Sequence, residues 1–297
     1  MRLLYVTDTH IGCSDAGYAL QPRYRPEERA ALFAALKELA REREVDALIH
    51  GGDVVDHGTP EEIDEALEVM AGLGVPTYVC LGNHDLMLAD SMEYWRTKGA
   101  WLLPEGGEAF ACEFAGATLV VVSHHWHPEH SFHWPPKEKL RPRLDERQAQ
   151  RLEEFCAQAE GPVIVVTHAP LNAVPAWQTG EVEPFHPPHP PYFDTFAAVA
   201  ARHANFRLAL CGHNHAHSVH NHETFVSCTT SSMIERPGQV RILTITDDAI
   251  EVETVSLAER AGLSTELADE RPWAAGNAAS RSFRVSCRGP VVLETKE

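Results

Sequence analysis

Short apolar segments rich in β-branched residues alternate along this 297-residue chain with longer segments of helical periodicity. The short segments, which we expect to be strands, are 2–7, 47–50, 75–81, 118–123, 163–167 and 207–211. Helices are predicted to begin near Pro26, Thr59 and Asp145, and Thr59 and Glu62 have the spacing of a capping box. Strands and helices that alternate in this way are typical of an α/β fold.

The last third of the chain has a different pattern, in which strand follows strand. Segments 224–228, 240–246 and 250–256 suit a meander that completes a sheet, and segments 283–287 and 291–294 suit a final hairpin. Residues 257–280, between them, are rich in Ala, Gly and acidic side chains. We therefore expect a main domain over residues 1–257 and a C-terminal tail or small appendage over residues 258–297.

Polar clusters follow five of the predicted strands, at the point where each strand ends. They are Asp8-Thr9-His10, Gly51-Gly52-Asp53, Gly82-Asn83-His84-Asp85, Thr167-His168-Ala169-Pro170 and Gly212-His213-Asn214-His215. Because the carboxyl ends of strands in open α/β sheets line one crevice, we expect the clusters to meet there. Each cluster contains a side chain that can bind a metal ion. Any one of them alone could also be a strand-end turn in which an aspartate caps backbone amides.

Taken in order, the patterns D-x-H, G-D, G-N-H-D, H and G-H-x-H resemble those of the metallophosphoesterase, or calcineurin-like phosphoesterase, superfamily, and most closely its cyclic-nucleotide phosphodiesterase-like branch. All five lie between Asp8 and His215. The resemblance implies an α/β fold built as a four-layer α/β/β/α sandwich with two mixed sheets and a metal site at the carboxyl ends of the strands. It also makes residues 1–257 a catalytic domain, a binuclear phosphodiesterase or phosphatase that hydrolyses a small phosphoester. Of the two we expect a phosphodiesterase.

The resemblance further implies two divalent transition-metal ions bridged by Asp53. The implied ligands are Asp8, His10, Asp53 and His215 for one ion, and Asp53, Asn83, His168 and His213 for the other. Nitrogen and oxygen donors without a thiolate suit Mn, Fe, Zn or Co, of which we expect Mn, Fe or both. Two such ions, about 3.5–4 Å apart, would generate a hydroxide and hold the phosphoryl oxygens.

The remaining histidine of these patterns, His84, has a different implied role. In the superfamily this histidine approaches the ester, as general acid to the leaving oxygen or as a stabiliser of charge in the transition state. Asp85, the next residue, is expected to hold it. The alternative is a histidine at a helix entry that is bonded to the backbone.

Two segments exceed what the core of such a fold needs, and both follow strands predicted to end at the metal crevice. Residues 123–136 and 173–192 are rich in His, Trp, Phe and Pro and poor in Lys. Long loops at such positions commonly carry binding residues. We therefore predict that the substrate is bound by His124, His125, Trp126 and Trp177. The alternative is a pair of surface loops or a dimer contact.

Charge and composition limit the partners. Asp and Glu outnumber Lys and Arg by 43 to 25, and the net charge of −18 disfavours a polymeric nucleic acid or a membrane surface as partner. No apolar run is long enough to span a bilayer, and the first apolar run is too short for a signal peptide. Seven cysteines without a C-x-x-C pair indicate a reducing compartment. We expect a cytoplasmic enzyme with a small phosphoester substrate, and we leave a homodimer open.

Two alternatives remain for the function. A DNA nuclease similar to the SbcD-type repair subunits would also begin with D-x-H-x-G, here Asp8 to Gly12, but the negative charge and the short chain after Ser256 argue against it. A binding scaffold on the same fold that has lost its metals would show ligand substitutions, and the five patterns show none.

Overall fold

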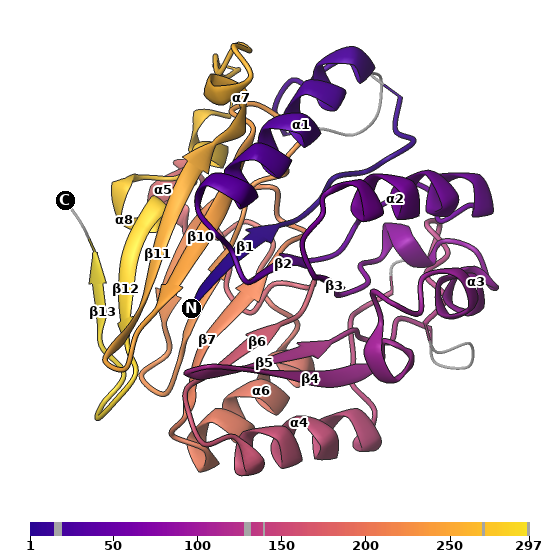
Figure 1. Cartoon of the computed structure of the whole chain (residues 1–297). Helices are drawn as coiled ribbons and strands as arrows, with labels where there is room; N and C mark the ends of the chain where they lie inside the picture. Colours follow the sequence, from indigo (N-terminus) through magenta and orange to yellow (C-terminus); the bar gives the residue numbers. More distant parts are fainter. Residues whose placement is uncertain (15–19, 128–131, 139, 269–270, 296–297) are drawn as a thin grey trace.

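The computed structural model describes residues 1–14, 20–127, 132–138, 140–268 and 271–295. Within these ranges the strands form two sheets (Figure 1), and the first has the order β13-β12-β11-β10-β1-β2-β3. Its strands are β1 (Arg2–Val6), β2 (Ala47–His50), β3 (Thr77–Val79), β10 (Gln239–Ile245), β11 (Ala249–Ser256), β12 (Ser282–Ser286) and β13 (Leu293–Thr295). β1, β2 and β3 run parallel and the other neighbours run antiparallel, so the sheet is mixed.

The second sheet is also mixed and has the order β4-β5-β6-β7-β9-β8. Its strands are β4 (Ala109–Phe114), β5 (Ala117–Val122), β6 (Val163–Val166), β7 (Phe206–Cys211), β8 (Ser218–Asn221) and β9 (Val226–Thr229). The four central strands run parallel, and the edge strands β4 and β8 are antiparallel to their neighbours.

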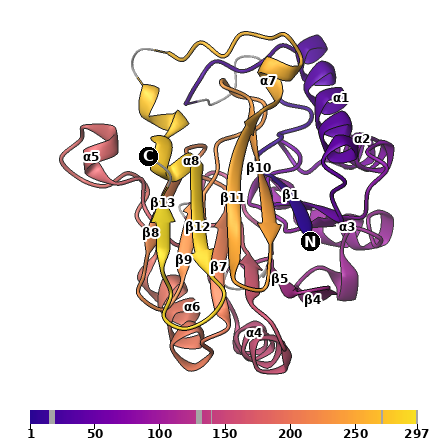
Figure 2. The ribbon, with the colours of Figure 1, turned by 60° about the vertical axis from the view of Figure 1, so that its left-hand side comes forward.

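Helices cover the outer faces of both sheets, which gives four layers (Figures 1 and 2). α1 (Pro26–Glu42) and α2 (Pro60–Gly72) pack on the first sheet, and α4 (Glu146–Gln158) and α6 (Pro190–Arg202) pack on the second. The shorter elements are η1 (His84–Leu86), α3 (Ser91–Lys98), η2 (Pro104–Gly106), α5 (Ala176–Thr179), α7 (Leu257–Arg260), η3 (Pro272–Ala275) and α8 (Ala278–Arg281). The predicted α/β/β/α sandwich with two mixed sheets is confirmed.

The first strand shows how the sequence produces this layering. Successive side chains of a strand point to opposite faces, and β1 is apolar at every position from Leu3 to Val6. Leu4 and Val6 belong to the core that the helices of the first sheet help to form. Leu3 and Tyr5 belong to the core between the two sheets. A strand that is apolar on both faces is thus covered on both.

The start of α2 is as predicted, but its capping differs. The hydroxyl of Thr59 accepts a hydrogen bond from the backbone N–H of Glu62 at 3.3 Å, and Pro60 occupies the first turn. The Glu62 carboxylate does not return to the backbone of Thr59, as a capping box would require. It accepts the backbone N–H of His57 at 2.7 Å, so the expected capping box is only half formed.

The C-terminal segment continues the first sheet. β12 pairs antiparallel with β11, with Val285 opposite Ile250, and β13 pairs antiparallel with β12. The predicted final hairpin is therefore confirmed. The division near residue 257 into a catalytic domain and a tail or appendage stays a prediction.

Candidate metal centre

The five polar clusters lie at the carboxyl ends of β1, β2, β3, β6 and β7, and they meet at one edge of the sandwich. Four of the predicted ligands follow strands of the first sheet and three follow strands of the second: Asp8, His10, Asp53 and Asn83, then His168, His213 and His215. A hydrogen bond joins the two sets directly, because the backbone N–H of His213 donates to the Asp8 carboxylate at 3.2 Å. Both sheets therefore contribute to a single site.

The donor atoms of these side chains form three groups, and within each group all atoms lie within 4.8 Å of one another. The groups are Asp8, His10 and His215; His10, Asp53 and His84; and Asp53, His168 and His213. Two contacts are short: Nε2 of His215 lies 3.2 Å from Oδ1 of Asp8, and Nε2 of His168 lies 3.2 Å from Oδ2 of Asp53. Asn83 contacts the third group, because its side-chain oxygen accepts a hydrogen bond from Nδ1 of His213 at 2.9 Å.

The backbone at this site is strained. Left-handed φ angles, which are unfavourable for residues other than glycine, occur at five of the predicted ligands: Asp8 (56°), His10 (40°), Asp53 (52°), His213 (66°) and His215 (48°). Strained residues of this kind cluster at functional sites, where the surrounding structure holds them in place. With these φ angles, the side chains at the ends of different strands point toward the same metal-binding region.

Two glycines allow the backbone to approach the carboxylates. A Cβ atom added at Gly82 would collide with the Asp53 side chain, and one added at Gly212 would collide with Thr7 and lie 2.7 Å from Oδ2 of Asp8. Neither glycine has a positive φ, so their role here is close approach rather than an unusual turn.

Buried acceptors orient three of the histidine rings. Nδ1 of His10 lies 3.0 Å from Oδ1 of Asp56, Nδ1 of His215 lies 3.0 Å from Oε1 of Glu235, and Nδ1 of His168 lies 2.9 Å from the carbonyl oxygen of Gly51. In His168 and His215 the Nδ1–H donates outward, and in His10 Nδ1 faces the Asp56 carboxylate, so in each ring Nε2 is the nitrogen left for the centre of the site. Neither of the two carboxylates, Asp56 and Glu235, was predicted from the sequence. Asp56 follows Asp53 by three residues, but no local pattern points to Glu235.

The charges at the site suit a cation. Burial would raise the pKa of Asp8, but the charge of His215 holds it down at about 2. Burial opposes the charge of Asp53 in the same way, and His168 keeps its pKa well below the ordinary range. Burial would lower the pKa of His168, but Asp53 raises it to about 9. The carboxylates thus stay ionised at neutral pH, and protonated imidazoles supply the positive charge that metal ions would replace.

His84 lies beside this cluster, with its side chain 31% exposed, but its partner is not the expected one. Its Nδ1–H donates to the carbonyl oxygen of Asp56 at 2.7 Å. The carboxylate of Asp85 is fully buried and accepts the backbone N–H groups of Val55 at 3.0 Å and Gly82 at 2.8 Å. Burial and the nearby charge of Asp53 raise the pKa of Asp85 to about 7. The expected contact between Asp85 and His84 is therefore wrong, because Asp85 holds the backbone around the site instead.

A cavity of about 510 Å³ opens beside the donor groups. Its lining includes the predicted ligand His213 together with Trp126, Trp134, Arg141 and His186. The Trp126 ring lies 6.3 Å from the ring of His213, and the Trp134 ring lies 5.6 Å from the ring of the half-exposed His84. Trp126 was predicted from the sequence to meet the substrate, whereas Arg141 and His186 were missed.

The other predicted substrate-binding residues do not line this cavity. His124 is fully buried behind Trp126, with the ring centres 4.6 Å apart. The ring of His125 is held 3.2 Å from Asp145 at the start of α4 and packs on a phenylalanine of its own loop. Trp177 is 70% exposed on α5, which projects from the body of the molecule in Figure 2. The loop path places each of these three side chains behind or outside the wall of this cavity, and their role in substrate binding stays a prediction.

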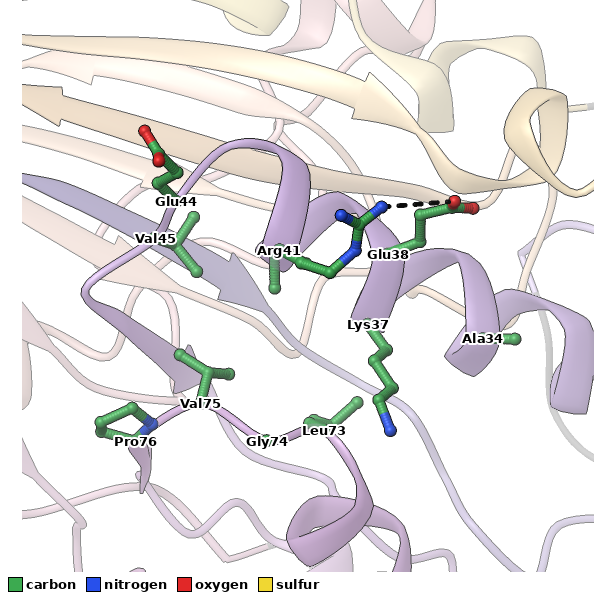
Figure 3. A pocket seen from close by; sticks show the side chains of 11 residues that line it. Ala34, Lys37, Glu38, Arg41, Glu44, Val45, Leu73, Gly74, Val75 and Pro76 are labelled. Carbon is green, nitrogen blue, oxygen red and sulfur yellow. Dashed lines mark ion pairs between the residues drawn. The ribbon is translucent and has the colours of Figure 1, made fainter.

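A second cavity, of about 570 Å³, lies between α1 and the chain that leads into β3 (Figure 3). Its lining includes Lys37, Glu38, Arg41, Val75 and Pro76. Val75 and Pro76 precede β3, so this cavity lies at the amino ends of the parallel strands, opposite the metal centre. Figure 3 shows the ion pair of Arg41 and Glu38, 3.9 Å apart, on its wall. None of the predicted site residues lines it.

Comparison with known proteins identifies the family. Residues 1–217 match the family model of the calcineurin-like phosphoesterases, and this range includes all five polar clusters. The chain belongs to the calcineurin-like phosphoesterase family. It is a metallophosphoesterase by family, and the family predicted from the sequence is confirmed.

Individual relatives of this phosphoesterase are distant. It is 34% identical over 89 residues to a 3′,5′-cyclic-nucleotide phosphodiesterase of Nostoc sp. strain PCC 7120, a match that covers 30% of this chain and 32% of the relative. A dimetal phosphatase from Danio rerio has a similar structure, with a TM-score of 0.64 and 15% identity over 86% of this chain and 96% of that one. The structure of a purple acid phosphatase from yellow lupin matches with a TM-score of 0.56 and 11% identity, over 90% of this chain and 52% of that one. The structural matches show the fold.

Proposed function

We propose that this phosphoesterase hydrolyses a small phosphodiester at a centre of two divalent transition-metal ions. The observation that carries the proposal is the position of Asp53, whose Oδ2 faces one proposed ligand of each ion, at 3.9 Å from Nε2 of His10 and 3.2 Å from Nε2 of His168. A carboxylate shared in this way is what a two-metal site requires of a bridging ligand. Further support comes from the cyclic-nucleotide phosphodiesterase with which the chain shares a segment.

The donor atoms fit such a pair of ions. Asp8, His10 and His215 would hold one ion, Asn83, His168 and His213 the other, and Asp53 both. The convergence of nitrogen and oxygen donors within 4.8 Å supports this assignment. The absence of a thiolate among them suits Mn, Fe, Zn or Co, and of these we propose Mn, Fe or both. When bound, the ions would supply a nucleophile from water at neutral pH and polarise the phosphoryl oxygens.

His84 would act as the general acid. Because its Nδ1–H donates to the carbonyl oxygen of Asp56, its Nε2 is the atom free to carry a proton toward an ester oxygen. The partial exposure of the ring lets a substrate reach it, and its centre lies 4.7 Å from the ring of His10. The proton would pass from Nε2 to the leaving oxygen as the bond to phosphorus breaks.

The cavity beside the centre would take one of the two ester groups. Trp126 and Trp134 supply apolar ring faces next to His213 and His84, which is where a group attached to the phosphate would lie. A cavity of about 510 Å³ has room for a group of nucleoside size. The net charge of −18 argues against a nucleic-acid polymer in this role.

The test is an activity panel on protein reconstituted with Mn, with metal content measured on the same sample. The panel contains nucleotide monoesters, cyclic nucleotides, phospholipid head-group diesters and single-stranded DNA. We expect two ions per chain and the highest kcat/KM for a small diester. A preference for DNA would favour the nuclease alternative, and one ion or fewer with no activity would overturn the two-metal mechanism.

Partners and location are narrower proposals. No helix in the described ranges is long and apolar enough to cross a membrane. A cytoplasmic location and a homodimer stay predictions, which cell fractionation and light scattering would test.

A further inference from the structure

The connection between β9 and β10, residues 230–238, runs directly beneath the metal centre. The hydroxyl of Ser232 donates to the carbonyl oxygen of Asp8 at 2.7 Å, and the backbone N–H of Met233 donates to that of Thr7 at 3.3 Å. This connection lies beyond residue 217, where the match to the family model ends.

The other side of the same connection is fixed by the segment that precedes α1. The backbone N–H of Tyr24 donates to the carbonyl oxygen of Ile234 at 2.9 Å, and that of Arg236 donates to Pro22 at 3.0 Å. Glu235 lies between these two bonds, and its own carbonyl oxygen accepts from Gly238 at 2.7 Å. The backbone of Glu235 is thus held on both sides.

The side chain of Glu235 is buried, with 1% of the residue exposed. Its Oε1 lies 3.0 Å from Nδ1 of His215 and 3.6 Å from Nε of Arg23, whose side chain is also buried. A buried carboxylate is destabilising unless nearby groups compensate its charge. Arg23 and His215 provide that compensation, so the carboxylate of Glu235 is held in place against one predicted metal ligand, His215.

We propose that Glu235 is a positioning residue of the metal centre, which holds the His215 ring through its Nδ1–H and so presents Nε2 to the ion. The proposal rests on the function proposed above, in which His215 is a ligand. A carboxylate behind a ligating histidine fixes the tautomer and the ring orientation and makes the ligating nitrogen more basic. Loss of such a partner typically weakens metal binding by about 10- to 100-fold.

Three substitutions separate orientation from charge. Glu235→Leu removes the negative charge and the oxygen that accepts from Nδ1 of His215. Glu235→Asp keeps the charge, but its shorter side chain moves the oxygen away from His215. Glu235→Gln removes the charge and keeps an acceptor oxygen on a side chain of the same length. Titration of the metal-free proteins with Mn²⁺, read by calorimetry and electron paramagnetic resonance, gives the affinity of each ion. We expect Glu235→Leu and Glu235→Asp to lower the affinity for one ion about 10- to 100-fold and to change the affinity for the other ion little. The Glu235→Gln variant should keep most of the wild-type affinity.

Two controls accompany the titration. Glu253→Gln removes the same charge from an exposed position of the first sheet, where Glu253 pairs with Arg43 at 3.3 Å, and is expected to bind both ions as the wild type does. Thermal unfolding of the metal-free variants separates lost affinity from lost folding, and Glu235→Asp and Glu235→Gln keep the comparison available if the leucine variant does not fold.

The outcomes distinguish this proposal from the one on which it rests. Two ions bound equally well by the wild type and by Glu235→Asp would overturn the role of Glu235 and leave the two-metal site standing. The two-metal site would be overturned if the wild type bound a single ion. The role of Glu235 would still be supported if the affinity for that ion were lower in Glu235→Asp and close to wild type in Glu235→Gln. A glutamine variant as weak as the aspartate variant would also contradict a positioning role.

Discussion

Nδ1 of His84 and the carbonyl oxygen of Asp56 lie 2.7 Å apart, which fixes the tautomer and the direction of a ring that stands at the mouth of the metal centre. The side chain of the same aspartate lies 3.0 Å from Nδ1 of His10. One residue therefore orients a predicted metal ligand through its carboxylate and the predicted general acid through its backbone.

His84→Asn is expected to keep both ions and to lose about 10²- to 10⁴-fold in kcat, the usual contribution of a general acid. The metal ligands are complete without His84, so binding and chemistry separate in this variant. Metal analysis and steady-state kinetics on the same preparation provide the measurement. His57→Asn, at an exposed histidine nearby, serves as control. Joint loss of metal and activity would show that His84 is a ligand.

Asp53→Ala is expected to have the largest effect on metal content. The substitution removes a donor from two groups and also the acceptor of the His84 backbone N–H, which bonds to Oδ1 at 2.9 Å. Without the shared carboxylate, two cations would repel each other. Elemental analysis after reconstitution with Mn should give fewer than one ion per chain, whereas Asp247→Ala, at an exposed turn, should keep two. Two ions in Asp53→Ala would contradict the bridging role.

Trp134→Ala is expected to raise KM for the preferred diester by about 5- to 150-fold, the range that corresponds to roughly 1–3 kcal/mol for a stacked base. The ring lines the cavity and lies beside His84. Trp177→Ala is the matched control, since that ring is exposed on α5 and should leave KM unchanged. Equal effects of the two substitutions would mean that the cavity does not hold the ester group.

Gly212→Ala is expected to destabilise the protein by about 1–3 kcal/mol, as overpacking typically does, and to weaken metal binding. The added methyl group would collide with Thr7 and Asp8, whose side chains are hydrogen-bonded to each other at 2.7 Å, and the Asp8 carboxylate also accepts the backbone N–H of His213 at 3.2 Å. Thermal unfolding and metal titration measure the two effects. Gly72→Ala, in α2 with no atom near its new methyl group, should be neutral or slightly stabilising. Wild-type behaviour of Gly212→Ala would show that the backbone can withdraw.

Acid sensitivity should be reduced in His222→Phe. Burial, and then the charge of His220, lower the pKa of His222 from its ordinary value of 6.5 to about 4. Between these values the unfolded chain binds more protons than the folded one, so the free energy of unfolding falls as the pH drops from 6.5 to 4. Phenylalanine keeps the ring beside Phe225 but cannot titrate. Urea unfolding with a chelator present should show a shallower fall, by roughly 1 kcal/mol. Parallel curves for the two proteins would contradict the assignment.

The fold and the centre of the site were predictable for one physical reason. Strand ends such as Val6-Thr7-Asp8 and Cys211-Gly212-His213 are local patterns, and the rule that parallel strands share a carboxyl edge converts local patterns into proximity. That rule places His10 and Asp53 at one edge of the first sheet, and His168 joins them because the second sheet packs against the first. The structure adds the strained φ angles, which no sequence spacing displays.

Residues on loops and connections could not be predicted in this way, because their positions depend on the course that the connection takes through the structure. Glu235 reaches His215 because the β9–β10 connection is held against Tyr24, a contact between segments about 210 residues apart in the sequence. The exposed position of Trp177 could not be predicted for the same reason, since composition alone does not say whether a loop folds inward or projects. Asp85 failed because adjacency in sequence gave no information on which way its carboxylate turns.

The division of the donor residues between two sheets makes the centre sensitive to shear. Asp53 follows a strand of the first sheet and His168 follows a strand of the second. Across the boundary between the two sheets, Oδ2 of Asp53 lies only 3.2 Å from Nε2 of His168. A slip of one layer over the other by an ångström or two would separate them, although each sheet could remain intact. Bound ions would therefore act as a mechanical tie between the layers. Substitutions at Ile164 or Leu210, deep between the sheets and distant in sequence from Asp53, would then reach the chemistry by changing how the layers align.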